Sequence, residues 1–245
     1  MKTNQQFKNE ALAALRGNWR KAVIITIIYL LIACLAVAPS SYTSVQMRSY
    51  VEENVSSHTS LTAMASMLQD PAYQLLSKRS QGASGFSTLV YILLLFPLTL
   101  GYANAMRKLL ISGDNNLTSN TFRIAFSNYW HKVWGMLWME ILVFLWSLLL
   151  IIPGIIKSFS YAMTPFILEE NPELDASAAI HRSRMMMRGH QFDLFWLFLG
   201  FLGWLILSLL TLGIGLLWLV PYMETSLAAF YEEVKADYAL NGGLD

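Results

Sequence analysis

Long apolar stretches alternate with short polar segments along this chain, and three of the polar segments have the same construction. In each, a polar helix leads into a turn that mixes basic and aromatic residues, and a long apolar stretch follows. The turns are residues 16–21, 128–132 and 188–192. This recurrence predicts three similar units, at about 5–110, 118–169 and 172–235, within a single integral membrane domain over residues 1–245.

Six apolar stretches are candidates for crossing a membrane, since about 20 apolar residues are needed to span roughly 30 Å of hydrocarbon. A soluble all-helical protein would instead need a polar face on most helices. The stretches 142–152 and 194–207 have no such face. The fourth candidate is short, so a re-entrant segment is its alternative reading. The six candidates are 22–38, 87–106, 133–152, 155–169, 194–210 and 212–231.

Two breaks divide the last four candidates into hairpins. Ile152-Pro153-Gly154 separates the third from the fourth, and residues 211–215 separate the fifth from the sixth. Proline removes a backbone donor and glycine loosens a helix, so a helix can end at either place. The pattern predicts an all-α, polytopic membrane helix bundle. It has about six transmembrane helices in three hairpin repeats, each preceded by a cytoplasmic amphipathic interfacial helix.

Residues 39–85 form the one long polar segment between two spans, and we interpret it as an extracytoplasmic insertion in the first hairpin. It is rich in Ser, Thr, Gln and Met, and Pro39 stands at its start. Its middle, 45–76, predicts one or two short helices with a break at Asp70-Pro71. A long loop of this kind is either a solvent-exposed connection or a functional cap.

Composition and charge are consistent with this interpretation and set its orientation. Of 245 residues, 55% are hydrophobic and 13% are charged, against about 25% charged in soluble domains. Most Lys and Arg residues lie in segments that the six-span arrangement places on one side, which predicts cytoplasmic N- and C-termini. The first apolar stretch is expected to be a retained signal anchor. A net charge of +1 gives no indication of nucleic-acid binding.

The helices that precede the odd-numbered spans place basic residues on one face and apolar residues on the other. Asn171-Pro172-Glu173 predicts the start of the third of these helices, and residues 118–127 form the least charged one. Such helices can lie in the headgroup layer, where anionic lipids attract each basic residue by about 1 kcal/mol. The alternative is that they only pack on the bundle. The candidate headgroup contacts are Arg16, Arg20, Lys21, Arg184 and Arg188.

Three charged residues interrupt the apolar stretches: Glu140, Lys157 and Glu224. A charge at mid-bilayer costs about 2.5–3.5 kcal/mol on insertion scales and suggests a function. With Tyr222, these residues are the candidate intramembrane polar site, which could line a cavity or bind a cation. The alternatives are a structural hydrogen bond or ion pair between spans and, for Lys157, a side chain that reaches the interface.

No catalytic, metal or phosphate-binding motif is present, so we expect no cofactor and no enzymatic activity. The expected function is binding or transport of a lipid or small solute by a protein embedded in the lipid bilayer. The alternative is a structural or regulatory subunit with a membrane-protein partner, and an intramembrane enzyme is the third possibility.

Several ordered motifs resemble a family of bacterial integral membrane proteins, domain-of-unknown-function family 975. The resemblance covers nearly the whole chain except the insertion at 39–85. It implies a multi-pass protein of the bacterial cytoplasmic (inner) membrane, and it carries over no catalytic residue. The motifs are Ala14-Leu15-Arg16-Gly17-Asn18-Trp19, Ile152-Pro153-Gly154, Asn171-Pro172-Glu173, Gly189-His190, Leu212-Gly213-Ile214-Gly215 and Pro221-Tyr222.

Overall fold

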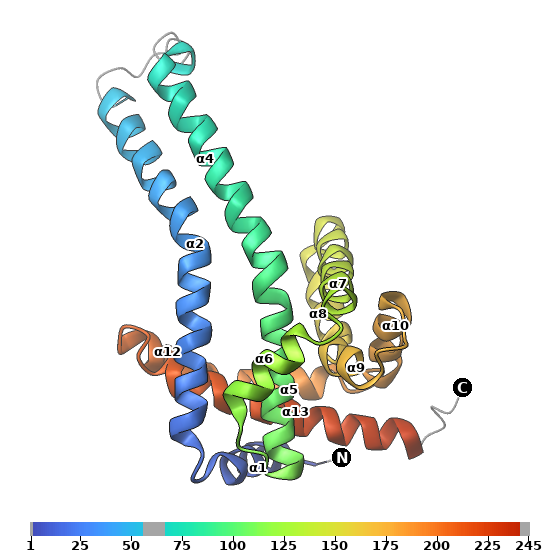
Figure 1. The fold of residues 1–245 in the computed structure, drawn as a ribbon. Helices are drawn as coiled ribbons and strands as arrows, with labels where there is room; N and C mark the ends of the chain where they lie inside the picture. Colours follow the sequence, from blue (N-terminus) through green and yellow to red (C-terminus); the bar gives the residue numbers. More distant parts are fainter. Residues whose placement is uncertain (1, 56–66, 241–245) are drawn as a thin grey trace. The chain divides into compact units, whose positions relative to one another are not determined.

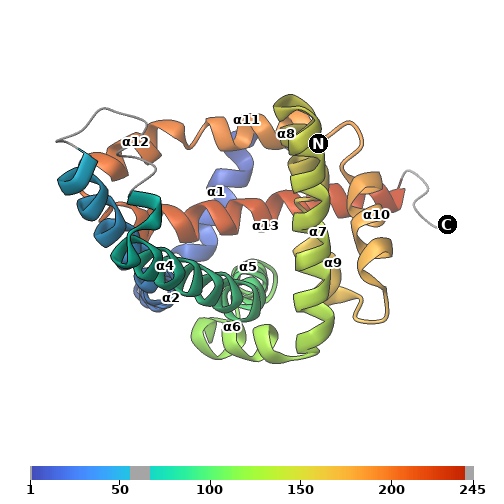
Figure 2. The ribbon, with the colours of Figure 1, turned by 90° about the horizontal axis from the view of Figure 1, so that it is seen from above.

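The computed structural model describes residues 2–55 and 67–240, and the regular structure in these ranges is helical. The prediction of an all-α fold is confirmed. The chain divides into two compact units, which are described separately below. The first consists of Met1–Tyr29 with Phe96–Asp245, and the second is Leu30–Leu95. Figures 1 and 2 label the helices.

Five helical segments of the described residues are long and apolar enough to cross a membrane, as expected for a membrane protein. The sixth predicted span, 212–231, is not among them. It falls in α13 (Leu216–Leu240), whose sequence includes Glu224, Glu232 and Glu233. The five segments are Trp19–Glu53, Pro71–Ser112, Tyr129–Leu149, Ile151–Glu170 and Gln191–Leu210.

Within Leu30–Leu95, helices are longer than predicted. Pro39 does not end the first apolar helix, because α2 runs without interruption from Trp19 to Val55. The break at Asp70-Pro71 is confirmed: the Asp70 side chain accepts a hydrogen bond from the Ala72 N–H at 2.8 Å and caps α4 (Pro71–Val90). A π-helical turn at Tyr91–Leu95 then leads into α5 (Phe96–Ser112). Part of the predicted insertion, 56–66, lies outside the described residues.

In the first unit, the three recurring turns share a backbone feature as well as residue types. They follow α1 (Asn4–Leu15), α6 (Leu117–Phe126) and α10 (Ala176–Met186). Each turn contains a residue with positive φ: Gly17 at 81°, Asn128 at 45° and Gly189 at 90°. Glycine and, less readily, asparagine adopt this conformation. The turns lead into α2, α7 (Tyr129–Leu149) and α11 (Gln191–Leu199).

The predicted break at 211–215 is confirmed, whereas the other break falls at Leu150, so that Ile152-Pro153-Gly154 lie in the first turn of α8 (Ile151–Tyr161) rather than between two helices. Between α7 and α8, a Cβ on Gly154 would lie 2.7 Å from the Cα of Ser147. Between α12 (Leu202–Leu210) and α13, a Cβ on Gly215 would lie 2.8 Å from the Cα of Ser208. The glycine therefore allows the two helices of each hairpin to approach closely just after the turn.

The predicted start of the third surface helix at Asn171 is wrong. Asn171 instead ends α9 (Thr164–Glu170), where its backbone N–H donates to the carbonyl oxygen of Ile167. Four residues later, Asp175 caps α10 and accepts a hydrogen bond from the Ala178 N–H at 2.9 Å. Both Asn and Asp favour helix ends, and proline after Asn171 marks a turn here rather than the first residue of a helix.

The core of the first unit forms around the second half of α13. Phe230 meets Phe7 of α1 edge to face, and Tyr231 stacks on Phe166 of α9 with ring centroids 4.7 Å apart. All four aromatic side chains are buried. In Figure 1, α13 lies across the direction of α5, and in Figure 2 α5 is seen nearly end-on while α13 is seen lengthwise. The two helices therefore cross at a steep angle.

Candidate functional site

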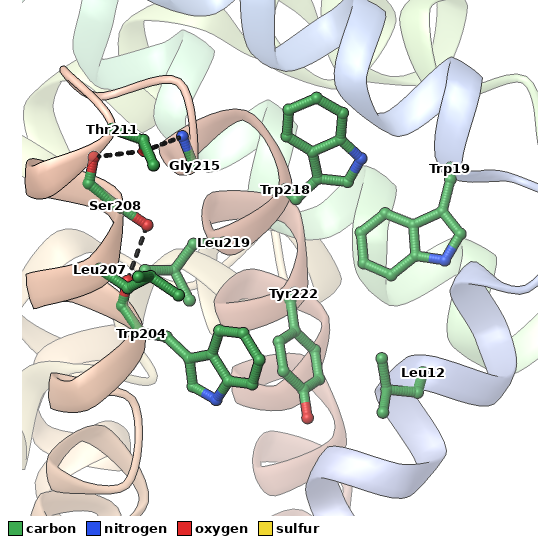
Figure 3. A pocket seen from close by; sticks show the side chains of 10 residues that line it. All are labelled: Leu12, Trp19, Trp204, Leu207, Ser208, Thr211, Gly215, Trp218, Leu219 and Tyr222. Atoms are coloured by element: carbon green, nitrogen blue, oxygen red, sulfur yellow. Dashed lines mark hydrogen bonds between the residues drawn. The ribbon is translucent and has the colours of Figure 1, made fainter.

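A cavity of about 420 Å³ lies where α1 and the start of α2 meet the hairpin of α12 and α13. We call it the aromatic pocket. Three tryptophans and a tyrosine surround it in Figure 3. Its volume falls in the range of about 300–1,000 Å³ that is typical of small-ligand sites. The lining residues are Leu12, Trp19, Trp204, Leu207, Ser208, Thr211, Gly215, Trp218, Leu219 and Tyr222.

The few polar groups at the hairpin end of the pocket are engaged with the chain itself. The Ser208 hydroxyl donates to the carbonyl oxygen of Trp204 at 2.8 Å, and the Thr211 hydroxyl donates to that of Ser208 at 2.9 Å. Thr211 also accepts a hydrogen bond from the Gly215 N–H at 3.2 Å (Figure 3). The pocket therefore offers a mainly apolar and aromatic surface to a ligand.

Positive charge lies beside the pocket. A second cavity of about 270 Å³ is lined by Arg20, and it shares Trp19 and Trp218 with the aromatic pocket. No acidic residue lines either cavity. A ligand that extended from one cavity to the other would meet hydrocarbon-like surface first and a guanidinium group next.

Lys8 of α1 holds the hairpin against the first helix. Its ammonium group donates to the carbonyl oxygen of Gly200 at 2.8 Å and lies 4.4 Å from the centre of the Phe201 ring. Burial lowers the pKa of Lys8 below its ordinary value because a charged amine loses hydration. The ring of Phe201 in turn meets Tyr222 edge to face, with centroids 5.0 Å apart.

Of the four residues predicted to form an intramembrane polar site, only Tyr222 lines this pocket. Glu140 lies exposed on the surface of α7. Lys157 of α8 places its ammonium group 4.7 Å from the centre of the Trp146 ring. Glu224 is half-buried on α13, within electrostatic reach of Tyr102. Glu140, Lys157 and Glu224 do not line the cavity that contains Tyr222.

The predicted headgroup-contacting residues are all on the protein surface. Arg16, Arg20, Lys21, Arg184 and Arg188 are exposed. Lys21 donates to Asn115 at 2.8 Å. The apolar faces of α1 and α10 are buried in the protein, as Phe7, Ala11 and Leu15 of α1 and Ala179 and Ile180 of α10 show.

Sequence reasoning missed a cluster of charges between α5, α9 and α13. Glu170 of α9 accepts hydrogen bonds from Arg107 of α5 and, at 2.5 Å each, from Tyr231 and Lys235 of α13. Arg107 also pairs with Glu232. The adjacent Glu169–Glu170 pair after an apolar stretch was the available signal. The cluster joins three helices, and none of its residues lines the aromatic pocket.

Sequence reasoning also treated Lys132 only as a positively charged residue at the surface. Its side chain is 1% exposed and pairs with Glu169 at 2.6 Å. It also donates to the carbonyl oxygen of Ile124 and to the Ser127 hydroxyl, next to the left-handed Asn128. Lys132 therefore binds the carbonyl group of Ile124 in the last turn of α6, where a cation is favourable. Its role in the fold is structural.

The described residues contain no group of three or more His, Cys, Asp or Glu side chains that could hold a metal ion. Neither the curated proteins nor the solved structures contain a match to this chain. A family model does match it, over residues 1–238, and the resemblance inferred from the motifs is confirmed. The chain belongs to the family described as "Protein of unknown function (DUF975)".

Proposed function

We propose that this protein binds a membrane lipid, with an acyl chain in the aromatic pocket. The pocket itself is the observation that supports this function, because tryptophan and leucine side chains line a cavity of ligand size. Sites for small molecules are mostly apolar and contain few polar groups. The polar groups at the hairpin end of this pocket are already hydrogen bonded within the chain. This combination suits hydrocarbon better than a polar solute.

The lipid proposed here is anionic. Arg20 lines the adjoining cavity, and Arg16 lies on the same turn. A guanidinium group forms charge-assisted hydrogen bonds with phosphate oxygens, frequently two at once. A headgroup at Arg20 would leave its acyl chain beside Trp19 and Trp218, which line both cavities. No catalytic step and no cofactor are part of the proposal.

We place the protein in the bacterial cytoplasmic membrane, with both termini in the cytoplasm. The bacterial character follows from the family resemblance, and the orientation follows from the distribution of Lys and Arg. Five segments are long and apolar enough to cross, and an even number of crossings puts both termini on the same side. The surface helices α1, α6 and α10 would then lie on the cytoplasmic side.

Lipid retention after purification tests the proposal. The protein would be purified in mild detergent, and its co-purified lipids and proteins identified by mass spectrometry. Leu207 lines the pocket and Leu205 does not, although both lie on α12. We expect Leu207→Trp to fill the pocket and reduce the retained phospholipid several-fold, while Leu205→Trp retains as much as the wild type. Equal retention in all three proteins would refute the proposed site.

Headgroup selection is tested in the same way. Arg20→Gln should lower the anionic fraction of the retained lipid, whereas Arg184→Gln, an exposed arginine that lines neither cavity, should leave it unchanged. Glu224 does not line the pocket, so Glu224→Gln should retain lipid like the wild type. The alternative function, a structural or regulatory subunit, predicts instead one fixed protein partner in all of these preparations and no lipid that depends on Leu207.

A further inference from the structure

We propose that the hairpin of α11, α12 and α13 does not cross the bilayer but lies in the lipid headgroup layer on the same side as α1. This inference concerns only the first unit and does not depend on lipid binding in the aromatic pocket. Its basis is the set of contacts that α1 and the first turn make along the hairpin.

The first helix contacts the middle of the hairpin and lines a pocket together with its tip. Lys8 binds the carbonyl oxygen of Gly200, at the junction of α11 and α12. Leu12 and Trp19 share the aromatic pocket with Ser208, Thr211 and Gly215, the residues of the tip. If Gln191–Leu210 crossed as a 20-residue helical segment, its tip would lie roughly 30 Å from its start along the membrane normal.

α1 cannot lie in the hydrocarbon beside such a tip. It begins at a capping box formed by Thr3 and Gln6. Lys2 pairs with Glu10 at 2.9 Å and with Glu233 of α13 at 3.5 Å. Charged residues of this density belong in water or among headgroups. Because the middle of the hairpin contacts this helix and the tip lines the same pocket as Leu12, both must lie at nearly its depth.

The directions of the helices agree with this placement. α13 crosses α5 at a steep angle, as the two views of the first unit show (Figures 1 and 2). α5 ends the apolar segment Pro71–Ser112, which is long enough to cross the membrane. If α5 runs along the membrane normal, α13 runs along the membrane plane.

The residues of the hairpin suit the interface. Exposed aromatic side chains occur along its whole length, at Phe192, Trp196, Trp204 and Trp218. A crossing helix would collect them near its two ends, whereas an interfacial helix carries them along one face. Leu212 at the tip is 95% exposed on the protein surface. The carboxylates of Glu224, Glu232 and Glu233 on α13 then need no passage through hydrocarbon.

Cysteine labelling decides between the two arrangements. Cys34 is the only cysteine, so Cys34→Ser gives an unlabelled background. Into it we would introduce Gln5→Cys, on the exposed face of α1, or Leu212→Cys, at the hairpin tip. A membrane-impermeant maleimide would be applied to right-side-out and to inverted membrane vesicles.

We expect both cysteines to react from the same side, which is the cytoplasmic side exposed in inverted vesicles. Reaction of Leu212→Cys from the side opposite to Gln5→Cys would overturn the proposal, because the hairpin would then cross. Reaction of Leu212→Cys only after the membrane is dissolved in detergent would also overturn it, since the tip would lie in hydrocarbon. Circular dichroism of each variant checks that its helical content is unchanged.

Discussion

Replacement of Gly101 by alanine should destabilise the protein even though alanine favours helices. Gly101 lies in α5 where this helix crosses α6. A Cβ at this position would lie 2.3 Å from the carbonyl oxygen of Thr121 and 2.9 Å from the backbone nitrogen of Ala125. Both atoms belong to the backbone of α6, so no side chain can rotate to make room. Ordinary contact begins at 3.4 Å, and α5 and α6 would have to separate by about 1 Å, since 3.4 minus 2.3 is 1.1.

Two opposing effects set the size of the loss. Alanine in a helix interior is favoured over glycine by about 0.5–1 kcal/mol. Overpacking of a tight contact costs about 1–3 kcal/mol, and the upper part of this range applies where backbone atoms must move. We therefore expect Gly101→Ala to lower the free energy of unfolding by about 1–2 kcal/mol.

Gly203 provides the matched control, because a Cβ there would meet no atom within 4 Å. Thermal unfolding of wild type, Gly101→Ala and Gly203→Ala would be followed by circular dichroism in one detergent. The expected order places Gly101→Ala below the wild type and Gly203→Ala at or above it. If Gly101→Ala unfolds at the same temperature as Gly203→Ala, the close approach of α5 and α6 is not present in the folded protein.

Three further changes follow from contacts in the first unit. Lys132→Met should be among the most destabilising single substitutions, by up to about 3–5 kcal/mol, because it leaves Glu169 unpaired; the double variant Lys132→Met/Glu169→Gln should recover part of the loss, and additive unfolding free energies would contradict this. Gly154→Ala should lower thermal stability and Ser147→Gly should partly restore it, since the new Cβ meets the Ser147 side chain and Cα; no rescue in the double variant would argue against this hairpin packing. Hydrogen bonds from Asn120 and from the backbone N–H of Asn116 hold the pKa of Asp114 below its ordinary value. The carboxylate therefore stabilises the fold above the unfolded-state pKa and loses this effect as the pH falls through the lowered pKa. Asp114→Ala should unfold at a lower temperature than the wild type at pH 7, and the two unfolding temperatures should converge in acid.

Features set by neighbouring residues could be predicted from the sequence. The turns at Gly17, Asn128 and Gly189 combine polar, aromatic and left-handed residues within a few positions. The breaks after Leu149 and Leu210 have Pro153 or Gly213 beside them. Periodicity and local backbone preference suffice for such features. Local reasoning failed where two preferences competed: Pro39 stands inside α2, where the helix tolerates the loss of one backbone donor.

Features made by distant residues could not be predicted in this way. Arg107 meets Glu232 across 125 positions and Glu170 across 63. The aromatic pocket likewise joins Leu12 and Trp19 to the last hairpin. Hydropathy identified the apolar stretches but contained no information on which helices cross and at what angle. It therefore predicted which segments are apolar enough to span the membrane, but not that Tyr222 lines a pocket with Leu12 and Trp19.

The contacts of Trp19 connect the pocket with the placement of the last hairpin. Trp19 follows the first turn and lines both the aromatic pocket and the cavity that contains Arg20. If the hairpin lies in the headgroup layer, the pocket lies at the same depth, because the hairpin forms most of its wall. Arg20 would then stand among lipid phosphates, and the apolar pocket beside it would receive an acyl chain bent back toward the interface. The two experiments separate these ideas. If lipid is retained but Leu212→Cys reacts from the side opposite to Gln5→Cys, the lipid site stands and its placement in the headgroup layer is refuted.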